Sequence, residues 1–540
     1  DSFVRIYDAD RKLVTEDDDS GPGVNSRAIF QATGDGPYYI EASGFRGNFK
    51  GKYAVTAQKT TAPEAHESLY WGTQVDDTNV TVYFAQDGDD VATGDPEFNT
   101  MTAESWSAFE IAQFEAAFDM LSAVSGLTFT VTTNANAADF TLVMDTDEFG
   151  DDGTLGFFNP PGEANEGVGV FNGDAWDDAS LAEGGIAFVT IVHELLHGLG
   201  LAHPHDDGGG STIMAGVTKD FDDFGDFDLN QGVFTTMSYN SGYFTGTNGS
   251  APSGDNFGYE AGPMALDIAV LQALYGVGGG HKAGDSNYKL AGANKAGTAW
   301  QAIWDTGGTD KISYGGDRDT TIDLRAATLT PGVGAGGYVS SAKGIAGGFT
   351  IAHGAKIENA RSGQGDDTLI GNGLGNVLKS GRGDDTLKGR SGADTLKAGK
   401  GWDDLYGGSG RDTLKGGKGN DTLVGDKGQD KLTGGNGHDV FDFNKASDSK
   451  AGSGKRDVIT DFGKGGDRIN LKSIDADTTT GGNQAFEFIG KGGFSDAGQL
   501  RIVNKGADRL VQGDRDGDGQ ADFEILLKDV SGLGSDDFAF

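Results

Sequence analysis

The chain has 540 residues, including 92 glycines, 10 prolines and no cysteine, and its formal net charge is −40. This acidity argues against nucleic-acid binding and favours cation binding, while the missing cysteines exclude disulfides, cysteine-ligated metals and a cysteine nucleophile. No apolar run reaches the roughly 18 residues that a membrane span requires. Stable membrane insertion is therefore not expected, and the length indicates three or four domains.

Residues 1–60 consist of short strand-like runs separated by turns. The runs cover 3–7, 12–15, 27–33, 38–41 and 52–57, a spacing that favours a small antiparallel β-sandwich. The chain opens without Met and passes directly into the first run. We interpret this start as a cut within a longer precursor, so that the missing leader says nothing about targeting.

Residues 61–280 mix helical and strand-like periodicity. A first helix is predicted from a cap at Thr102 to Gly126, followed by strands over 127–133 and 140–145. Two further helices are predicted over 185–199 and 263–275. This part is expected to form an α+β domain.

The second of these helices carries a metal-binding pattern. His193 and His197 are four residues apart and share one helical face. Gly200 can end the helix and turn the chain back, so that His203 arrives as a third nitrogen ligand. Three protein ligands leave zinc an open position for water, and Glu194 is placed to act as the general base.

The alternative is a set of surface histidines on a helix and turn. It does not explain why four of the eight histidines lie between His193 and His205. We expect His205 to be a solvated loop residue. The extended motif is that of the metzincins, which also carry a Met-containing turn under the zinc. Met237 fits that turn and would form an apolar base beneath the ligands.

A strict repeat occupies residues 362–442, which divide into nine units of nine residues. The sixth position is Asp in all units but one, which has Asn376, and the eighth is Leu or Phe. This pattern predicts a parallel β-roll with an inward apolar column and with Asp and backbone oxygens binding Ca²⁺, as in RTX proteins. The candidate calcium ligands are Asp367, Asp385, Asp394, Asp403, Asp412, Asp421, Asp430 and Asp439.

Two alternatives accompany this interpretation. A flexible Gly/Asp-rich linker would not keep nine units in register. The acidic loop at 514–519 also has oxygen ligands at alternate positions, but it lacks the Glu of an EF-hand, and an acidic β-turn explains it as well.

Several segments together resemble the serralysin family. They are His203-Pro204, the turn at 236–239 with Tyr239, and the segments 263–268 and 274–276, followed by the repeats. The resemblance covers roughly residues 65–540 and implies a secreted, extracellular zinc metalloendopeptidase with Zn²⁺ and Ca²⁺, acting on proteins and peptides. Departures are Thr236, where Ser is common, and the loops at 206–210 and 220–228.

The resemblance also implies roles for individual residues. Tyr239 would approach the zinc in the resting enzyme and then stabilise the oxyanion during catalysis. Asp305, Asp310 and Glu358 would add calcium ligands ahead of the repeats. Residues 535–540 resemble a C-terminal signal for a one-step (type I) ABC exporter, although a strand end is the alternative. The exporter and a proteinaceous inhibitor are further candidate partners.

The expected architecture is multidomain. Residues 1–60 resemble part of a bacterial pre-peptidase C-terminal β-sandwich, 61–280 form the α+β metzincin domain, 281–442 the calcium-binding β-roll, and 443–540 a C-terminal β-sandwich. The alternative function is a calcium-dependent surface-layer or binding protein with a vestigial protease domain. The intact set of His193, Glu194, His197, His203 and Tyr239 argues against it.

Overall fold

The structure is a computed structural model that describes residues 2–7, 13–17, 39–44, 64–94, 99–146, 149, 153–246, 252–463 and 465–540. Near the N-terminus, β1 (Ser2–Tyr7) pairs antiparallel with β2 (Leu13–Asp17) and β3 (Tyr39–Gly44) in the order β2-β1-β3. These strands match three of the five expected runs. The runs at 27–33 and 52–57 lie outside the described residues.

A five-stranded sheet follows, in the order β7-β4-β8-β10-β9. Its first four strands are parallel and β9 runs antiparallel at the edge. A separate hairpin pairs β5 with β6. The bounds are β4 (Asn79–Phe84), β5 (Asp90–Ala92), β6 (Thr100–Thr102), β7 (Thr128–Val131), β8 (Phe140–Asp145), β9 (Gly156–Phe158) and β10 (Val168–Asn172).

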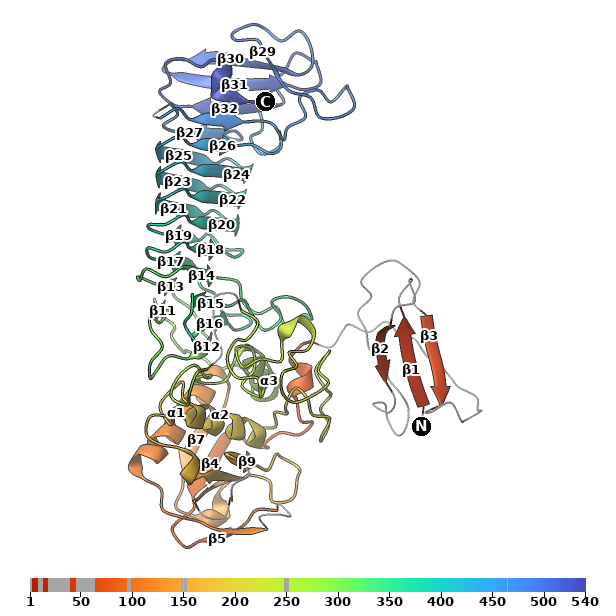
Figure 1. The fold of residues 1–540 in the computed structure, drawn as a ribbon, viewed down its shortest axis with the longest axis vertical. Coiled ribbons are helices and arrows are strands. Elements are labelled where there is room, and N and C mark those ends of the chain that lie inside the picture. The colour runs from red at the N-terminus through yellow and green to blue at the C-terminus, as the bar shows by residue number, and fades with distance from the viewer. Residues whose placement is uncertain are drawn as a thin grey trace.

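Three α-helices belong to this part of the chain (Figure 1): α1 (Ala108–Val124), α2 (Ile186–Gly198) and α3 (Ala265–Tyr275). The predicted cap at Thr102 is wrong, because Thr102 belongs to β6. Ser107 caps α1 instead, accepting the N–H of Glu110 while the Glu110 carboxylate accepts the N–H of Ser107. Both α2 and α3 bury most of their side chains in one apolar cluster, which fixes α2 from several sides.

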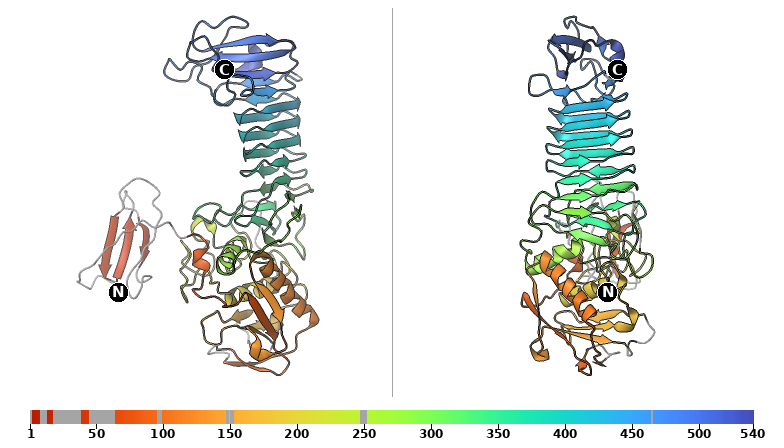
Figure 2. Two further views of the ribbon diagram at one scale, coloured as in Figure 1. Left: turned by 180° about the vertical axis from the view of Figure 1, so that it is seen from behind. Right: turned by 90° about the vertical axis from the view of Figure 1, so that its left-hand side faces the viewer.

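From residue 287 onward the chain forms two sheets that stack as a long column (Figures 1 and 2). In spatial order, the first sheet contains β11 (Asn287–Lys289), β13 (Lys311–Ser313), β17 (Asn359–Arg361), β19 (Val377–Lys379), β21 (Thr395–Lys400), β23 (Thr413–Lys418), β25 (Lys431–Asn436), β27 (Asp457–Ile459), β32 (Phe523–Leu527), β31 (Asp508–Asp514), β30 (Gln499–Lys505) and β29 (Glu487–Phe488). The second contains β12 (Trp300–Ile303), β16 (Gly348–Ile351), β15 (Ser340–Ala342), β14 (Thr320–Asp323), β18 (Thr368–Ile370), β20 (Thr386–Ser391), β22 (Asp404–Gly410), β24 (Thr422–Gly428), β26 (Val440–Asp442), β28 (Arg468–Asn470) and β33 (Phe538–Ala539).

The repeat units alternate between these two sheets. Leu396 pairs with Leu414 in the first sheet, and Leu387 with Leu405 in the second, so equivalent residues stack 18 positions apart. The Leu or Phe at the eighth position of every unit has 0% exposure, which confirms the predicted apolar column. Glycine is required between coils: Gly417 has φ +130°, and a Cβ there would collide with the carbonyl oxygen of Gly399.

The expected C-terminal β-sandwich shares its sheets with the repeats. β27 pairs with β25 on one side and β32 on the other, while β28 joins β26 to β33. The last residues form a 3₁₀ turn over Ser535–Asp537 and then β33, in which Phe538 is buried at 5% exposure. Among the described residues, no helix is long and apolar enough to cross a lipid bilayer.

Candidate metal centres

Three histidines converge where α2 ends. His193 and His197 come from α2, and the chain then turns at Gly200, whose φ of +88° and contact with the Thr73 carbonyl leave no room for a side chain. The turn brings His203 back to the helix. Its Nε2 lies 3.0 Å from the Nε2 of His193 and 3.0 Å from that of His197. The structure thus brings the three predicted ligand atoms together.

The opposite ring nitrogen of each histidine is held by an oxygen atom. Carbonyl and carboxylate oxygens only accept hydrogen bonds, so each Nδ1 carries the proton and each Nε2 keeps a lone pair directed inward. The pairs are His193 Nδ1 with Thr236 O at 2.8 Å, His197 Nδ1 with Leu201 O at 2.9 Å, and His203 Nδ1 with Asp206 Oδ2 at 2.6 Å.

This arrangement fits a zinc ion. Burial lowers the pKa of His193 to about 4 and holds the pKa of His197 well below its usual value, so these imidazoles are neutral near pH 7. Neutral lone pairs that face each other at 3.0 Å repel unless a cation lies among them. Three histidine nitrogens with one position left open are the donor set of catalytic zinc.

Glu194 follows the first ligand and is 7% exposed. It faces the edge strand β9, because a Cβ placed on Gly156 would lie 3.4 Å from the Glu194 Cγ. Burial raises the pKa of Glu194 to about 8. A carboxyl group beside the metal ligands with an elevated proton affinity is suited to proton transfer.

Tyr239 lies against the histidine cluster while keeping 38% exposure. Its ring centroid is 4.6 Å from that of His203 and 5.9 Å from that of His193. Burial raises the pKa of the Tyr239 phenol, and the nearby Glu194 carboxylate raises it further. The phenol therefore keeps its proton and can donate it in a hydrogen bond.

The turn before Tyr239 is fixed by Asp267, a residue to which sequence reasoning assigned no role. Its carboxylate accepts the hydroxyl of Thr235 at 2.5 Å and the N–H groups of Thr236 at 2.7 Å and Met264 at 2.8 Å. Thr236 in turn holds His193 through its carbonyl. Met237 is fully buried in the apolar cluster that includes α2. The sequence feature that could have pointed to Asp267 is its position as an acid in the first turn of a mostly apolar helix.

The expectation that His205 is solvated is wrong. Its side chain is only 11% exposed, and its ring stacks on His203 at a centroid distance of 4.8 Å and an interplanar angle of 9°. The tight turn closed by the Asp206 N–H and the His203 carbonyl, at 3.2 Å, folds His205 back onto the site. Asp206 also lies in the loop that departs from the family pattern, and sequence reasoning missed its contact with His203.

The repeat aspartates form a second kind of site. In each pair, one carboxylate oxygen accepts the backbone N–H of the equivalent residue one coil earlier, as in Asp394 N to Asp412 Oδ1 at 2.8 Å. Oδ2 of Asp385 and Oδ2 of Asp367 each accept an N–H of their own coil, from Gly381 at 3.4 Å and from Gly363 at 3.2 Å. In the other repeat aspartates the second oxygen is buried and has no hydrogen-bond partner within the described chain. These unpartnered Oδ2 atoms belong to Asp394, Asp403, Asp412, Asp421, Asp430, Asp439 and Asp457. A row of buried carboxylate oxygens fits hard cations such as Ca²⁺.

The other predicted calcium ligands also cluster. The Asp310 N–H donates to the Glu358 carboxylate at 2.8 Å, while Oδ2 of Asp310 is buried without a hydrogen-bond partner among the described residues. Burial raises the pKa of Asp310, and the charges of Asp305 and Glu358 raise it further. At 514–519, by contrast, both Asp514 oxygens accept N–H groups of the loop's own glycines, as in an acidic turn.

Comparison with known proteins gives two family matches and several relatives. Residues 98–231 match the family described as Matrixin, and residues 272–528 match the Peptidase M10 serralysin C terminal family. Metallopeptidase AprA of Pseudomonas marginalis is 30% identical over 293 residues, covering 51% of this chain and 56% of that protein. A Serralysin C of Dickeya chrysanthemi is 30% identical over 386 residues, covering 67% of this chain and 73% of that protein.

The Asp206 contact predicts a metal-affinity effect. Asp206→Ala removes the acceptor that orients the His203 imidazole, so zinc affinity should fall by about 10- to 100-fold. Titration of the metal-free protein with zinc against a competing chelator measures this. Asp207→Ala, an exposed neighbour, is the control and should leave affinity unchanged. Equal affinity of the Asp206 variant and the wild type would contradict the assignment.

Proposed function

Since the chain belongs to the serralysin family of metalloproteases, we propose that it is a secreted zinc endopeptidase that hydrolyses peptide bonds in proteins. The observation that carries this proposal is the convergence of three Nε2 lone pairs beside Glu194 and Tyr239. In a vestigial protease domain this arrangement of side chains would have no function. The chain covers little more than half of the AprA relative, so substrate and partners are part of the proposal.

Each catalytic side chain has a separate task. Bound zinc supplies a Lewis acid that polarises the scissile carbonyl and favours deprotonation of water. Glu194 accepts the proton of the attacking water and delivers it to the leaving amine, a task for which its buried position beside His193 places it. Tyr239 donates its phenolic O–H to the oxyanion that develops on the carbonyl oxygen. Asp206 and Asp267 orient the histidines.

The repeats are proposed to bind Ca²⁺ and thereby to stabilise the protein. Without a cation, the buried carboxylates must be protonated or repel one another. The proposed division is a metzincin domain at 61–280, a calcium-binding roll at 281–442 and a C-terminal region at 443–540 that ends in an export signal for a type I ABC exporter. Residues 1–60 are proposed as an accessory β-sandwich fragment.

A second prediction concerns the general base. Glu194→Gln keeps the side-chain shape but removes the proton acceptor, so casein hydrolysis should fall by at least about 100-fold. Zinc content and the circular dichroism spectrum should stay unchanged. Glu163→Gln, on the exposed surface, is the control and should retain activity. Wild-type turnover by the Glu194 variant would refute the mechanism.

Tyr239 is tested by removing only its hydroxyl. Tyr239→Phe keeps the ring packed on His203, so substrate binding should be preserved while kcat falls by about 10²- to 10³-fold. Steady-state kinetics on a fluorogenic peptide separate kcat from KM. Tyr406→Phe, on the distant strand β22, should change neither. A rise in KM with kcat intact would show that Tyr239 only binds substrate.

Calcium removal should unfold the repeats. Burial raises the pKa of Asp430 to about 8 and that of Asp457 to about 9, against about 3.9 in an unfolded chain. When a chelator has removed calcium, the carboxyl groups of Asp430 and Asp457 contribute most to the free energy of unfolding below about pH 4. This contribution is lost as the pH rises through 8 and 9.

The chelated chain should therefore have a lower free energy of unfolding at pH 8 than at pH 6. Calcium, which binds the deprotonated carboxylates, should stabilise the chain more at pH 8. Urea unfolding followed by circular dichroism, with and without chelator at both pH values, measures these differences. A β spectrum and an unfolding midpoint that do not respond to chelation would rule out a calcium-binding roll.

A further inference from the structure

The outer face of the first sheet carries a line of cationic side chains along the repeats. Arg361, Lys379, Lys397 and Lys415 occupy the same register position on β17, β19, β21 and β23 and form one column. A second column follows three residues further along the chain, with Arg382 paired to Lys400 and Lys400 to Lys418. All seven side chains are exposed.

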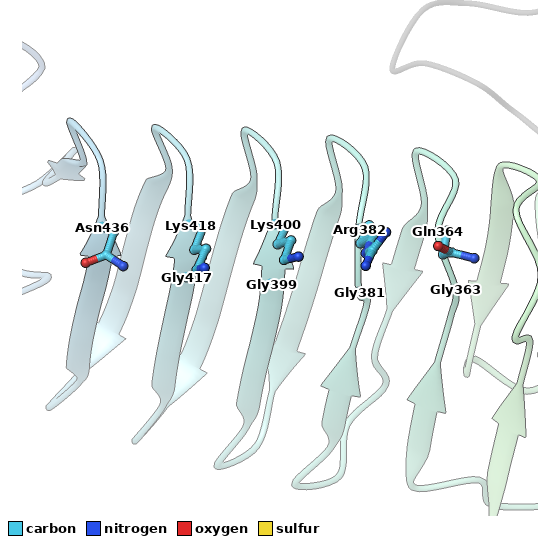
Figure 3. A pocket seen from close by; sticks show the side chains of 9 residues that line it. All are labelled: Gly363, Gln364, Gly381, Arg382, Gly399, Lys400, Gly417, Lys418 and Asn436. Atoms are coloured by element: carbon cyan, nitrogen blue, oxygen red, sulfur yellow. The ribbon is translucent and has the colours of Figure 1, made fainter.

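The second column lines a shallow groove of about 680 Å³. In Figure 3, Arg382, Lys400 and Lys418 stand in a row on successive coils, with Gln364 and Asn436 at the two ends. The floor consists of glycine backbone. A second hollow of about 610 Å³ adjoins it, shares three lining residues with it, and adds Lys289, Lys311 and Arg361. We call the two together the cationic groove.

The charge of this groove is opposite to that of the whole protein. Its lining residues include six Lys or Arg and no Asp or Glu, whereas the chain carries a net charge of −40. A chain so rich in carboxylates has many available anions. Their exclusion from one continuous strip therefore points to a function of the strip.

The fold does not explain the cations. None of the seven forms an ion pair within the part of the chain that the structure describes. Like charges on adjacent strands, about 4.8 Å apart, destabilise a sheet. The same register position is held by Thr433 on β25, so an uncharged side chain is tolerated there.

Asp366 and Asp384 lie in the edge turns, two residues after Gln364 and Arg382, and their carboxylates accept backbone N–H groups of the next coil. The carboxylate of Asp366 accepts the N–H of Asp384 at 2.8 Å, and that of Asp384 accepts the N–H of Trp402 at 2.7 Å. Trp402 itself is 68% exposed, two residues after Lys400. Its ring lies over the next coil, because a Cβ on Gly419 would be 3.3 Å from the Trp402 Cδ1.

From these observations we propose that the cationic groove binds a linear anionic polysaccharide. Polyuronates carry one carboxylate on each ring, and a 1→4-linked pyranose is close in length to the strand spacing. The carboxylates on one face of such a chain recur about every second or third ring, and so fall near every second or third cation of the column. The glycine floor lets a flat chain approach the sheet. The exposed indole of Trp402 offers a face on which the C–H groups of a sugar ring can pack.

Other polyanions fit less well. An extended acidic peptide repeats its side chains on one face every ~6.7 Å, out of step with the columns. Single-stranded nucleic acid is bound by several aromatic platforms in succession, whereas Trp402 is the one exposed large hydrophobic residue of the nine repeat units, all of them described. Bound polysaccharide would hold the protease on an anionic matrix without occupying the zinc site.

The test uses the full chain in calcium and polygalacturonate as the probe, with binding measured by calorimetry. The variant Arg382→Ser/Lys400→Ser/Lys418→Ser removes three groove charges. The control Lys388→Ser/Arg411→Ser/Lys427→Ser removes three exposed charges that do not line the groove. We expect the groove variant to bind about tenfold or more weakly and with a shallower salt dependence, while the control binds as the wild type. Casein hydrolysis should be unchanged in both.

Three outcomes would overturn the proposal. They are equal weakening in the control variant, equal binding of the fully methyl-esterified polysaccharide, and tighter binding of poly-L-glutamate or duplex DNA. If the triple variant fails to fold, Lys400→Ser alone replaces it. The change in Trp402 fluorescence on adding polygalacturonate then reports binding, with Trp402→Phe to identify the signal. If Trp402→Phe abolishes the fluorescence change but leaves the affinity for polygalacturonate unchanged, only the stacking contact of Trp402 is contradicted.

Discussion

A buried donor or acceptor atom needs a partner, and this protein buries two sets of atoms for which we propose a cation as the partner. Three imidazole lone pairs meet at 3.0 Å beside α2, and a row of aspartate oxygens lies unpartnered in the described coils of the roll. Hydrogen bonds fix the orientation of the side chains in both sets. The histidines are oriented by hydrogen bonds to their outer nitrogens, and the aspartates by the backbone N–H of the neighbouring coil. In the proposed function, zinc and calcium would therefore have different consequences: zinc would serve chemistry at a single point, while calcium would compensate charge along the length of the roll.

The catalytic arrangement depends on elements that are far apart in the sequence. α2 provides two of the proposed zinc ligands and the proposed base, the return turn provides the third proposed ligand, and the turn under α3 supplies both Tyr239 and the carbonyl that holds His193. Asp267 links the turn that carries Tyr239 to helix α3. Its carboxylate accepts the N–H of Thr236 in the turn and the N–H of Met264 at the start of α3. The position of Tyr239 is thus coupled to the packing of a helix that contributes no ligand.

Local patterns predicted the features that depend on local geometry. The spacing of His193 and His197 places both on one helical face wherever the helix lies, and the nine-residue period fixes which residues point inward. The start of α1 was misplaced at Thr102, although the sequence contains the Ser107–Glu110 pair that forms the capping box. The burial of His205 and the role of Asp267 depend on how a turn folds back and on which helix meets which loop. Sequence periodicity carries no information about either contact.

The continuity of the two roll sheets into the C-terminal region has a consequence for the order of events during synthesis. Every coil of a parallel roll leaves an open edge of backbone groups for the next coil, and an unpaired edge is prone to pair with other chains. The edge of β27 is covered by β32 and the edge of β28 by β33, and both covering strands follow every coil in the chain. During synthesis the coils are therefore made before the strands that cover their edges, and the growing polypeptide carries uncovered edges at β27 and β28 until β32 and β33 have emerged.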